Sequence, residues 1–123
     1  MKTIMIVDDS PTMLMSLEGM LSKGGFSIIK ANSGEQAYEM LKGGQKPALI
    51  ITDLNMGTMN GIALISSVRK QPGFQFVRRL MLTTESQQEK RSEAKAAGAT
   101  GWLVKPVQPD ALMGVIKQVV PGA

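Results

Sequence analysis

Short apolar runs recur along this chain, and most of them end at a residue with a charge or a hydroxyl group. Four such runs are Ile4–Val7, Leu49–Thr52, Leu80–Leu82 and Trp102–Val104, and a less regular fifth is Phe26–Ile29. They are too short for helices and contain many strand-forming residues. Because nearly continuous apolar strands are buried on both faces, the pattern predicts a parallel sheet covered by helices.

The segments between these runs carry helical periodicity and helix-end signals. Five helices are predicted, and they start after Ser10, at Ser33, near Met59, at Ser86 and after Pro109. Ser33 and Ser86 are each followed three residues later by Gln or Glu, as in a capping box, and Gly98 is placed to end the fourth helix. Five strand–helix units in 123 residues predict one doubly wound α/β domain spanning residues 1–123.

The composition excludes several classes of chemistry. The chain has no cysteine and no histidine, so disulfides, Cys or His metal sites and thiolate or imidazole catalysis are ruled out. The net charge is +4, but aromatic residues make up only 4% of the chain and no long basic run occurs, so we expect no nucleic-acid binding. No stretch approaches the ~20 apolar residues of a membrane span. Acids follow the first apolar run too early for a signal peptide, so we expect a cytoplasmic protein without membrane insertion.

The most reactive side chains stand at the ends of the predicted strands. Asp8 and Asp9 follow the first run, Asp53 the third, Thr83 the fourth and Lys105 the last. In open α/β sheets, ligands bind outside the carboxyl ends of the strands. Crowded carboxylates repel one another unless a cation lies among them, and an oxygen-only ligand set suits Mg²⁺ together with a substrate phosphate. A lysine and a threonine hydroxyl beside them also suit phosphate.

Each of these residues also has an ordinary structural interpretation. An acid at a strand end often caps a helix or lies in a solvated turn, and Asp9 could cap the helix that starts after Ser10. Thr83 could be a strand-end hydroxyl, and Lys105 an exposed lysine before a turn proline. Five groups suited to phosphate and a divalent ion at one edge of a sheet nevertheless favour a shared site.

Four stretches carry a resemblance to a known family: Ile6–Ser10, Ile51–Met56, Met81–Glu85 and Gly98–Pro106. In their order and spacing the chain resembles the receiver domain of two-component response regulators over essentially its whole length. It is most similar to the CheY-like single-domain chemotaxis regulators. The resemblance implies the flavodoxin-like (βα)5 receiver fold with strand order 2-1-3-4-5, the order known for CheY itself.

The resemblance also implies a role for each residue at the strand ends. Asp53 would accept a phosphoryl group from the phosphohistidine of a sensor histidine kinase, giving an aspartyl phosphate. The groups that would hold Mg²⁺ are Asp8, Asp9, Asp53 and the backbone carbonyl of Asn55. Lys105 and the Thr83 hydroxyl would neutralise charge on the transferring oxygens, and Lys105–Pro106 would be a cis peptide. Such a chain is a phosphoacceptor switch that catalyses only its own phosphorylation and dephosphorylation.

Two further implications concern switching and the lifetime of the phosphoryl group. Thr83 would move toward the phosphoryl group while an aromatic side chain on the last strand swings inward. Trp102 holds that aromatic position, where tyrosine or phenylalanine is usual, and it could equally be a partly exposed anchor in a binding surface. Asn55 and Glu85 lie two residues after Asp53 and Thr83 and would flank the phosphoryl group, which favours a lifetime of about seconds to minutes.

The fourth helix, the last strand and the last helix would form the output surface, where Lys90, Arg91 and Lys95 lie near Trp102. The expected partners of this lone, monomeric receiver are a sensor histidine kinase, a protein target such as a flagellar motor switch component, and a phosphatase. Three alternatives stay open: a phosphate sink or relay, a receiver fragment of a longer transcriptional regulator, and a Mg-dependent aspartyl phosphatase. The phosphatase is disfavoured because Asn55 stands where such enzymes usually carry a second acid.

Overall fold

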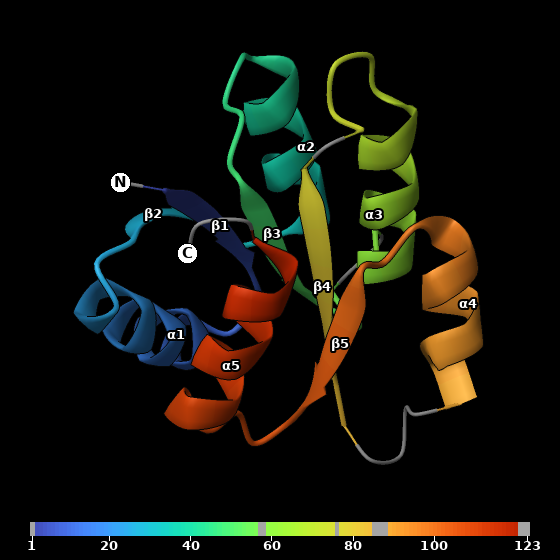
Figure 1. Ribbon diagram of the computed structural model, residues 1–123. Helices are drawn as coiled ribbons and strands as arrows, with labels where there is room; N and C mark the ends of the chain where they lie inside the picture. The colour runs from blue at the N-terminus through green and yellow to red at the C-terminus, as the bar shows by residue number, and fades with distance from the viewer. Residues whose placement is uncertain (1, 57–58, 76, 85–88, 121–123) are drawn as a thin grey trace.

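The computed structural model describes residues 2–56, 59–75, 77–84 and 89–120, in which strands and helices alternate (Figure 1). In chain order the elements are β1 (Thr3–Val7), α1 (Pro11–Lys23), β2 (Ser27–Ala31), α2 (Gly34–Lys42), β3 (Leu49–Asp53), α3 (Gly61–Lys70), β4 (Arg78–Thr83), α4 (Arg91–Ala97), β5 (Gly101–Val104) and α5 (Pro109–Val119).

All five strands belong to one parallel sheet in the order β2-β1-β3-β4-β5. This confirms the predicted fold and strand order. The helices α1 and α5 cover one face of the sheet, and α2, α3 and α4 lie on the other (Figure 1). The direction of winding reverses between β1 and β3, so the carboxyl ends of these two adjacent strands border the crevice where this class of fold binds ligands.

Alternate residues of each central strand face the two helical layers. In β1, Ile4 and Ile6 belong to the core cluster under α1 and α5, whereas Met5 and Val7 belong to the cluster under α2 and α3. A third, smaller cluster includes Met81 of β4 and lies toward α3 and α4. Because both faces of the strands are buried, nearly every strand position is apolar, which is the pattern seen in the sequence.

Some element boundaries differ from the predictions. The strand β2 begins at Ser27 and not at Phe26, because Phe26 packs against the core cluster of α1 and α5 before the strand starts. The helix α3 begins at Gly61, two residues later than predicted. Its start is set by Asn60, whose side chain accepts a hydrogen bond from the Ala63 amide at 2.8 Å.

The helix caps predicted at Ser10 and Ser33 are present. Ser10 accepts a hydrogen bond from the Met13 amide at 3.2 Å, and Ser33 caps α2 in the same way. The side chain of Gln36 accepts from the Asn32 amide at 2.6 Å. The return contact of the expected capping box is therefore made one residue earlier than in its standard form.

At the other end of a helix, Gly98 follows α4 with a φ of 115°, a left-handed conformation that favours glycine. This confirms the predicted end of the fourth helix. The capping box predicted at Ser86 lies outside the described residues. Within the described part of the chain, no helix has the length and apolar character needed to span a membrane.

Candidate functional site

Three carboxylates meet where β1 and β3 end side by side. Asp8 and Asp9 follow the last residue of β1, and Asp53 is the last residue of β3. One oxygen atom from each of the three carboxylates lies within 4.8 Å of the others. Asp8 and Asp53 are buried and Asp9 is exposed, so the cluster opens to solvent on the side of Asp9.

Lys105 brings a positive charge to these carboxylates from the far side of β4. It follows β5, and its amide donates to the Thr83 carbonyl at 2.7 Å, which continues the pairing of β4 with β5. Its Nζ lies 2.8 Å from Oδ1 of Asp53 and 3.8 Å from Oδ2 of Asp8. The next peptide bond, Lys105–Pro106, is cis, as the resemblance implied.

The two carboxylate oxygens of Asp8 have different partners. Oδ1 accepts a hydrogen bond from the Ser10 amide at 2.9 Å. Oδ2 is buried and has no hydrogen-bond partner within the described residues; its contact is the 3.8 Å ion pair with Lys105. Burial raises the pKa of the Asp8 carboxyl, and this effect outweighs the lowering by the Ser10 amide; Asp53 and Asp9 raise it and Lys105 lowers it.

This arrangement fits a hard divalent cation. A buried carboxylate oxygen without a donor, next to two further carboxylates, is a costly arrangement that a cation relieves. All three groups offer oxygen, which suits Mg²⁺. Asn55, whose backbone carbonyl was the expected fourth ligand, lies exposed two residues beyond the end of β3.

Thr83 ends β4 and is buried close to this edge of the sheet. Its hydroxyl donates to the backbone carbonyl of Leu103 in β5 at 3.4 Å. In this conformation the Thr83 hydroxyl is therefore held by the neighbouring strand. Its contact links the site to β5 at the residue next to Trp102.

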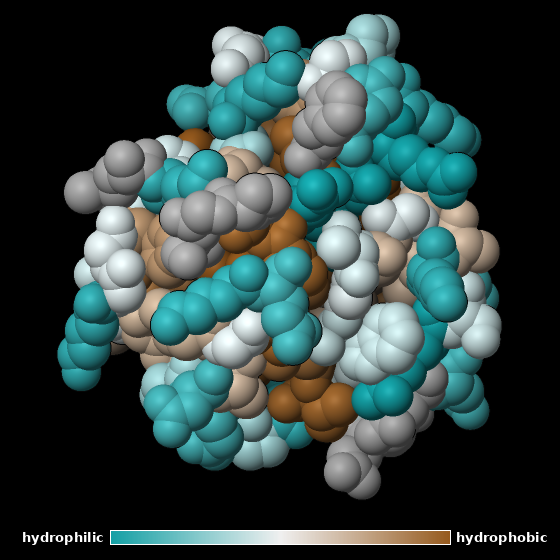
Figure 2. All heavy atoms as spheres, viewed as in Figure 1, coloured by the Kyte–Doolittle hydropathy of each residue, from teal (hydrophilic) through white to brown (hydrophobic). Residues whose placement is uncertain are grey.

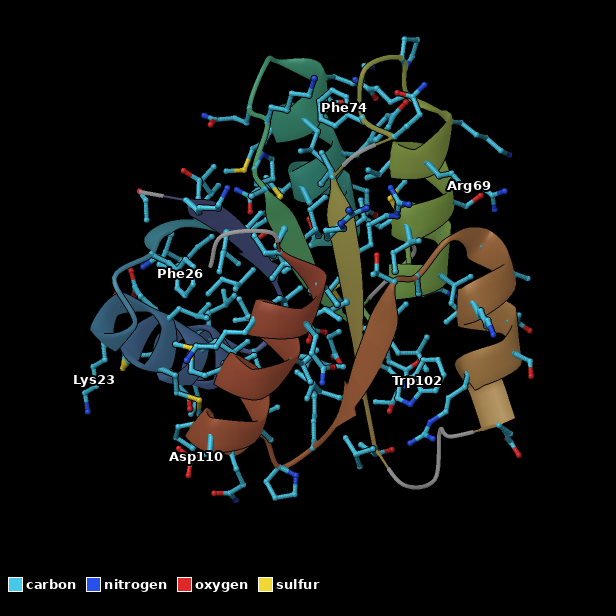
Figure 3. The ribbon with its side chains drawn as sticks, in the orientation of Figure 1. Lys23, Phe26, Arg69, Phe74, Trp102 and Asp110 are labelled. Carbon is cyan, nitrogen blue, oxygen red and sulfur yellow. The ribbon has the colours of Figure 1, made fainter. Side chains whose placement is uncertain are left out.

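Trp102 lies half-buried between β5 and α4 (Figure 3). It packs against the small core cluster that contains Met81 and Ala94. The guanidinium carbon of Arg91 lies 4.9 Å from the centre of its ring. This placement is compatible with both interpretations made from the sequence, a switching aromatic and a surface anchor.

Of the remaining predicted residues, Lys90 lies just before α4 and Lys95 lies within it, and both are exposed. Lys90 forms an ion pair with Glu93 at 3.9 Å. Glu85, predicted to flank the phosphoryl group, lies outside the described residues.

Sequence reasoning missed Gly61, which lets α3 start directly behind Asp53. A Cβ atom at Gly61 would collide with the backbone carbonyl of Asp53 and lie 2.8 Å from the sulfur of Met81. The signal was available: a glycine directly after Asn60, in the first turn of a predicted helix, indicates a close backbone approach.

Comparisons with known proteins agree with this geometry. The family described as response regulator receiver domain matches residues 4–117. Chemotaxis protein CheY1 of Helicobacter pylori is 33% identical over 118 residues, covering 95% of each chain. Protein PilH of Pseudomonas aeruginosa is 31% identical over 122 residues, covering 99% of this chain and all of that one. Among solved structures, chemotaxis response regulator CheY4 of Vibrio cholerae superposes with a TM-score of 0.90 and 37% identity, covering 98% of this chain and 99% of that one.

Proposed function

The chain belongs to the response regulator receiver family, and we propose that it is a phosphoacceptor switch in which a histidine kinase phosphorylates Asp53. The observation that carries this proposal is the position of the Asp53 carboxylate. It ends β3 beside the carboxylates of Asp8 and Asp9 and within 2.8 Å of the Lys105 ammonium. A carboxylate in such a setting can attack phosphorus while the surrounding positive charge stabilises the product.

In the proposed transfer, a carboxylate oxygen of Asp53 forms a bond to phosphorus as the bond from phosphorus to the kinase's histidine nitrogen breaks. The nitrogen keeps the electron pair of the broken bond, and the imidazole, protonated on its other ring nitrogen before the transfer, leaves as the neutral group. Charge spreads over the three transferring oxygens in the transition state. Positioning and charge neutralisation are therefore the main tasks of the residues around Asp53.

Mg²⁺ would be held by Asp8, Asp9, Asp53 and the Asn55 carbonyl, and when bound it supplies positive charge to the transferring oxygens. The buried Oδ2 atom of Asp8 supports this assignment, since it has no hydrogen-bond partner within the described residues. Lys105 is the second source of positive charge. Once Asp53 carries the phosphoryl group, the ammonium of Lys105 exchanges its 2.8 Å contact with the carboxylate for one with the phosphoryl group.

Thr83 would couple the phosphoryl group to β5. Its hydroxyl donates to Leu103 in the structure described here, and a phosphoryl oxygen is a stronger, charged acceptor for the same proton. We propose that the hydroxyl turns to the phosphoryl group and releases the Leu103 carbonyl. Trp102, the neighbouring residue, is the proposed switching aromatic.

Asn55 and Glu85 are proposed to set the lifetime of the aspartyl phosphate by flanking the path of the attacking water. Asn55 is exposed two residues after Asp53, and this supports its proposed role beside the path of the attacking water. A lifetime of about seconds to minutes follows if the amide orients a water molecule for in-line attack. The same assignment predicts a longer lifetime in Asn55→Arg without loss of phosphorylation.

The likeness to chemotaxis proteins named CheY supports a role in chemotaxis, with a sensor kinase as donor and a protein such as a flagellar motor switch component as target. The output surface is proposed on α4, β5 and α5. No observation on this chain favours the aspartyl phosphatase that the sequence left open.

A small acyl phosphate donor and Mg²⁺ test the proposal, with intact mass as the readout. We expect the wild-type chain to gain one phosphoryl group, and we expect no gain in Asp53→Asn or when a chelator removes Mg²⁺. Asp9→Ala, which loses one proposed ligand, requires several-fold more Mg²⁺ for the same gain. A phosphoryl group on Asp53→Asn to the wild-type extent contradicts the proposal.

A further inference from the structure

Arg91, the first residue of α4, lies over the ring of Trp102. Its guanidinium carbon is 4.9 Å from the ring centre, inside the roughly 6 Å range of a cation–π contact. The indole lies between β5 and α4, with the ring toward the helix (Figure 3). The first turn of α4 and the centre of β5 are therefore tied together through these two side chains.

The Trp102 ring is a contact of the Arg91 guanidinium within the described part of the chain. The Nε atom of Arg91 is buried and has no hydrogen-bond partner within the described part of the chain. A buried guanidinium nitrogen without an acceptor is unfavourable unless another interaction compensates. The Trp102 ring, whose centre lies 4.9 Å from the guanidinium carbon, offers such an interaction. Arg91 would lose this interaction if the ring moved away.

Lys90 shows that this contact is specific to Arg91. Lys90 is the neighbouring cation and is about half exposed, and its Nζ pairs with Glu93 at 3.9 Å. The Lys90 ammonium is exposed to solvent, and an exposed ion pair of this kind contributes little to stability. The two residues therefore carry the same charge at the start of α4, but Arg91 lies over the Trp102 ring and Lys90 pairs with Glu93.

Trp102 is also next to the residue that receives the Thr83 hydroxyl. Thr83 donates to the Leu103 carbonyl at 3.4 Å, and Trp102 lies opposite Met81 in the pairing of β4 with β5. A change in the Thr83 contact therefore acts on β5 at Leu103, next to the residue that Arg91 contacts. Trp102 thus adjoins two contacts: the Thr83–Leu103 hydrogen bond, which we expect to change on phosphorylation, and the Arg91 contact, which we expect to hold the ring in place.

We propose that Arg91 is a positioning residue that holds Trp102 against α4 in the unphosphorylated chain and so sets how readily the ring moves when Asp53 is phosphorylated. This inference rests on the proposed function of Asp53. Loss of a partly buried cation–π contact shifts the ratio of outward to inward ring positions by about threefold to tenfold toward the inward position. Arg91 thereby keeps the unphosphorylated switch in the off position.

The chain contains one tryptophan, so its indole proton signals in NMR report on Trp102 alone. Nuclear Overhauser contacts from the indole to the Ala94 methyl group indicate the outward ring, and contacts to the Thr83 methyl group indicate the inward ring. The variants are Arg91→Met, which keeps length without charge, Arg91→Lys, which keeps charge without the planar group, and Lys90→Met as the matched control. Each is measured with and without phosphodonor and Mg²⁺, and intact mass is recorded on the same samples.

We expect unphosphorylated Arg91→Met to lose contacts to Ala94 and gain contacts to Thr83, with Arg91→Lys intermediate and Lys90→Met like the wild type. Unphosphorylated Arg91→Met with the wild-type contact pattern overturns the inference, and so does an equal change in Lys90→Met. Failure of the proposed function is seen separately, as the absence of a mass gain in the wild-type chain. Arg91→Lys keeps the test valid if Arg91→Met does not fold.

Discussion

The Asp8 carboxyl is buried, and its burial makes the free energy of unfolding depend on pH. The folded chain holds the Asp8 proton more tightly than the unfolded chain, because burial raises the pKa of Asp8 above 3.8. The ionised group therefore lowers the free energy of unfolding. This cost is absent below pH 3.8, grows as the pH rises toward the raised pKa, and is complete above it.

Replacing Asp8 with Asn removes this cost while keeping an oxygen for the Ser10 amide. We expect Asp8→Asn to be more stable than the wild type by about 1 kcal/mol at neutral pH without Mg²⁺. Mg²⁺ should then stabilise the wild type and have little effect on the variant. Thermal unfolding with and without Mg²⁺ measures both effects. A variant that is less stable in metal-free buffer, or equally stabilised by Mg²⁺, contradicts the account of Asp8.

Gly61 is the residue whose lack of a side chain positions Asp53. We expect Gly61→Ala to lower the free energy of unfolding by about 1–3 kcal/mol, because its Cβ would collide with the Asp53 carbonyl. Gly114→Ala is the matched control, since a Cβ at this helical position has nothing within 4 Å. It should stabilise the chain by about 0.5–1 kcal/mol. Urea denaturation compares the two, and a stabilising Gly61→Ala would show that the approach of α3 to Asp53 is not tight.

At the residue scale, it was predictable that Asp8, Asp9 and Asp53 lie at one edge of the sheet, because residues that follow parallel strands gather there. The approach of Lys105 follows from the same rule. The contact of Thr83 with Leu103 was not predictable, since a hydroxyl on a buried strand end has several acceptors within reach and only packing decides among them. The contact of Arg91 with Trp102 depends in the same way on where α4 lies.

Among the elements, α4 is held at its carboxyl end by two arginine side chains from outside the helix. Nη1 of Arg69 donates to the Ala96 carbonyl at 2.9 Å, and Nε of Arg79 donates to the Gly98 carbonyl at 2.8 Å. Burial lowers the pKa of Arg79, and the neighbouring positive charges of Arg69 and Arg78 lower it further. Two guanidinium groups thus satisfy carbonyls that a helix end leaves without partners.

Removal of one of these guanidinium groups should loosen α4. We expect Arg79→Met to lower the free energy of unfolding by about 1.5–3 kcal/mol, the range for a hydrogen bond to a charged group. Amide hydrogen exchange in α4 should become faster than in α1 or α5. Lys70→Met, an exposed change at the end of α3, is the control. If exchange in α4 is the same in both variants, the Arg79 contact does not hold the helix.

The order of strands and helices was predictable from the sequence, but the residues at which they begin and end were less so. The apolar runs marked all five strands, because strands buried on both faces leave little room for polar residues. The predicted start of β2 was wrong because Phe26 is apolar but packs against the core cluster of α1 and α5 before the strand begins. The helix α3 starts later than the apolar pattern indicates, because the Asn60 side chain caps it by accepting from the Ala63 amide.

For the molecule as a whole, periodicity indicated a doubly wound α/β domain, but it could not order the strands. The order came from the resemblance, because many windings of five strand–helix units share one pattern of apolar runs. The observed order matters for function: it makes β1 and β3 neighbours and puts Asp8 and Asp53 together. On the face seen in Figure 2, hydrophilic side chains surround hydrophobic ones that gather near the centre.

We propose that Asp53 is the one carboxylate of this chain that accepts a phosphoryl group. Borohydride reduction tests it most directly, because it converts an aspartyl phosphate to homoserine and so marks the modified position. After treatment with an acyl phosphate donor and Mg²⁺, the reduced chain is digested and its peptides are sequenced by mass spectrometry. The account predicts homoserine at position 53 alone. Homoserine at position 8 or 9, or a phosphoryl group that resists reduction and lies on a serine or threonine, would contradict it.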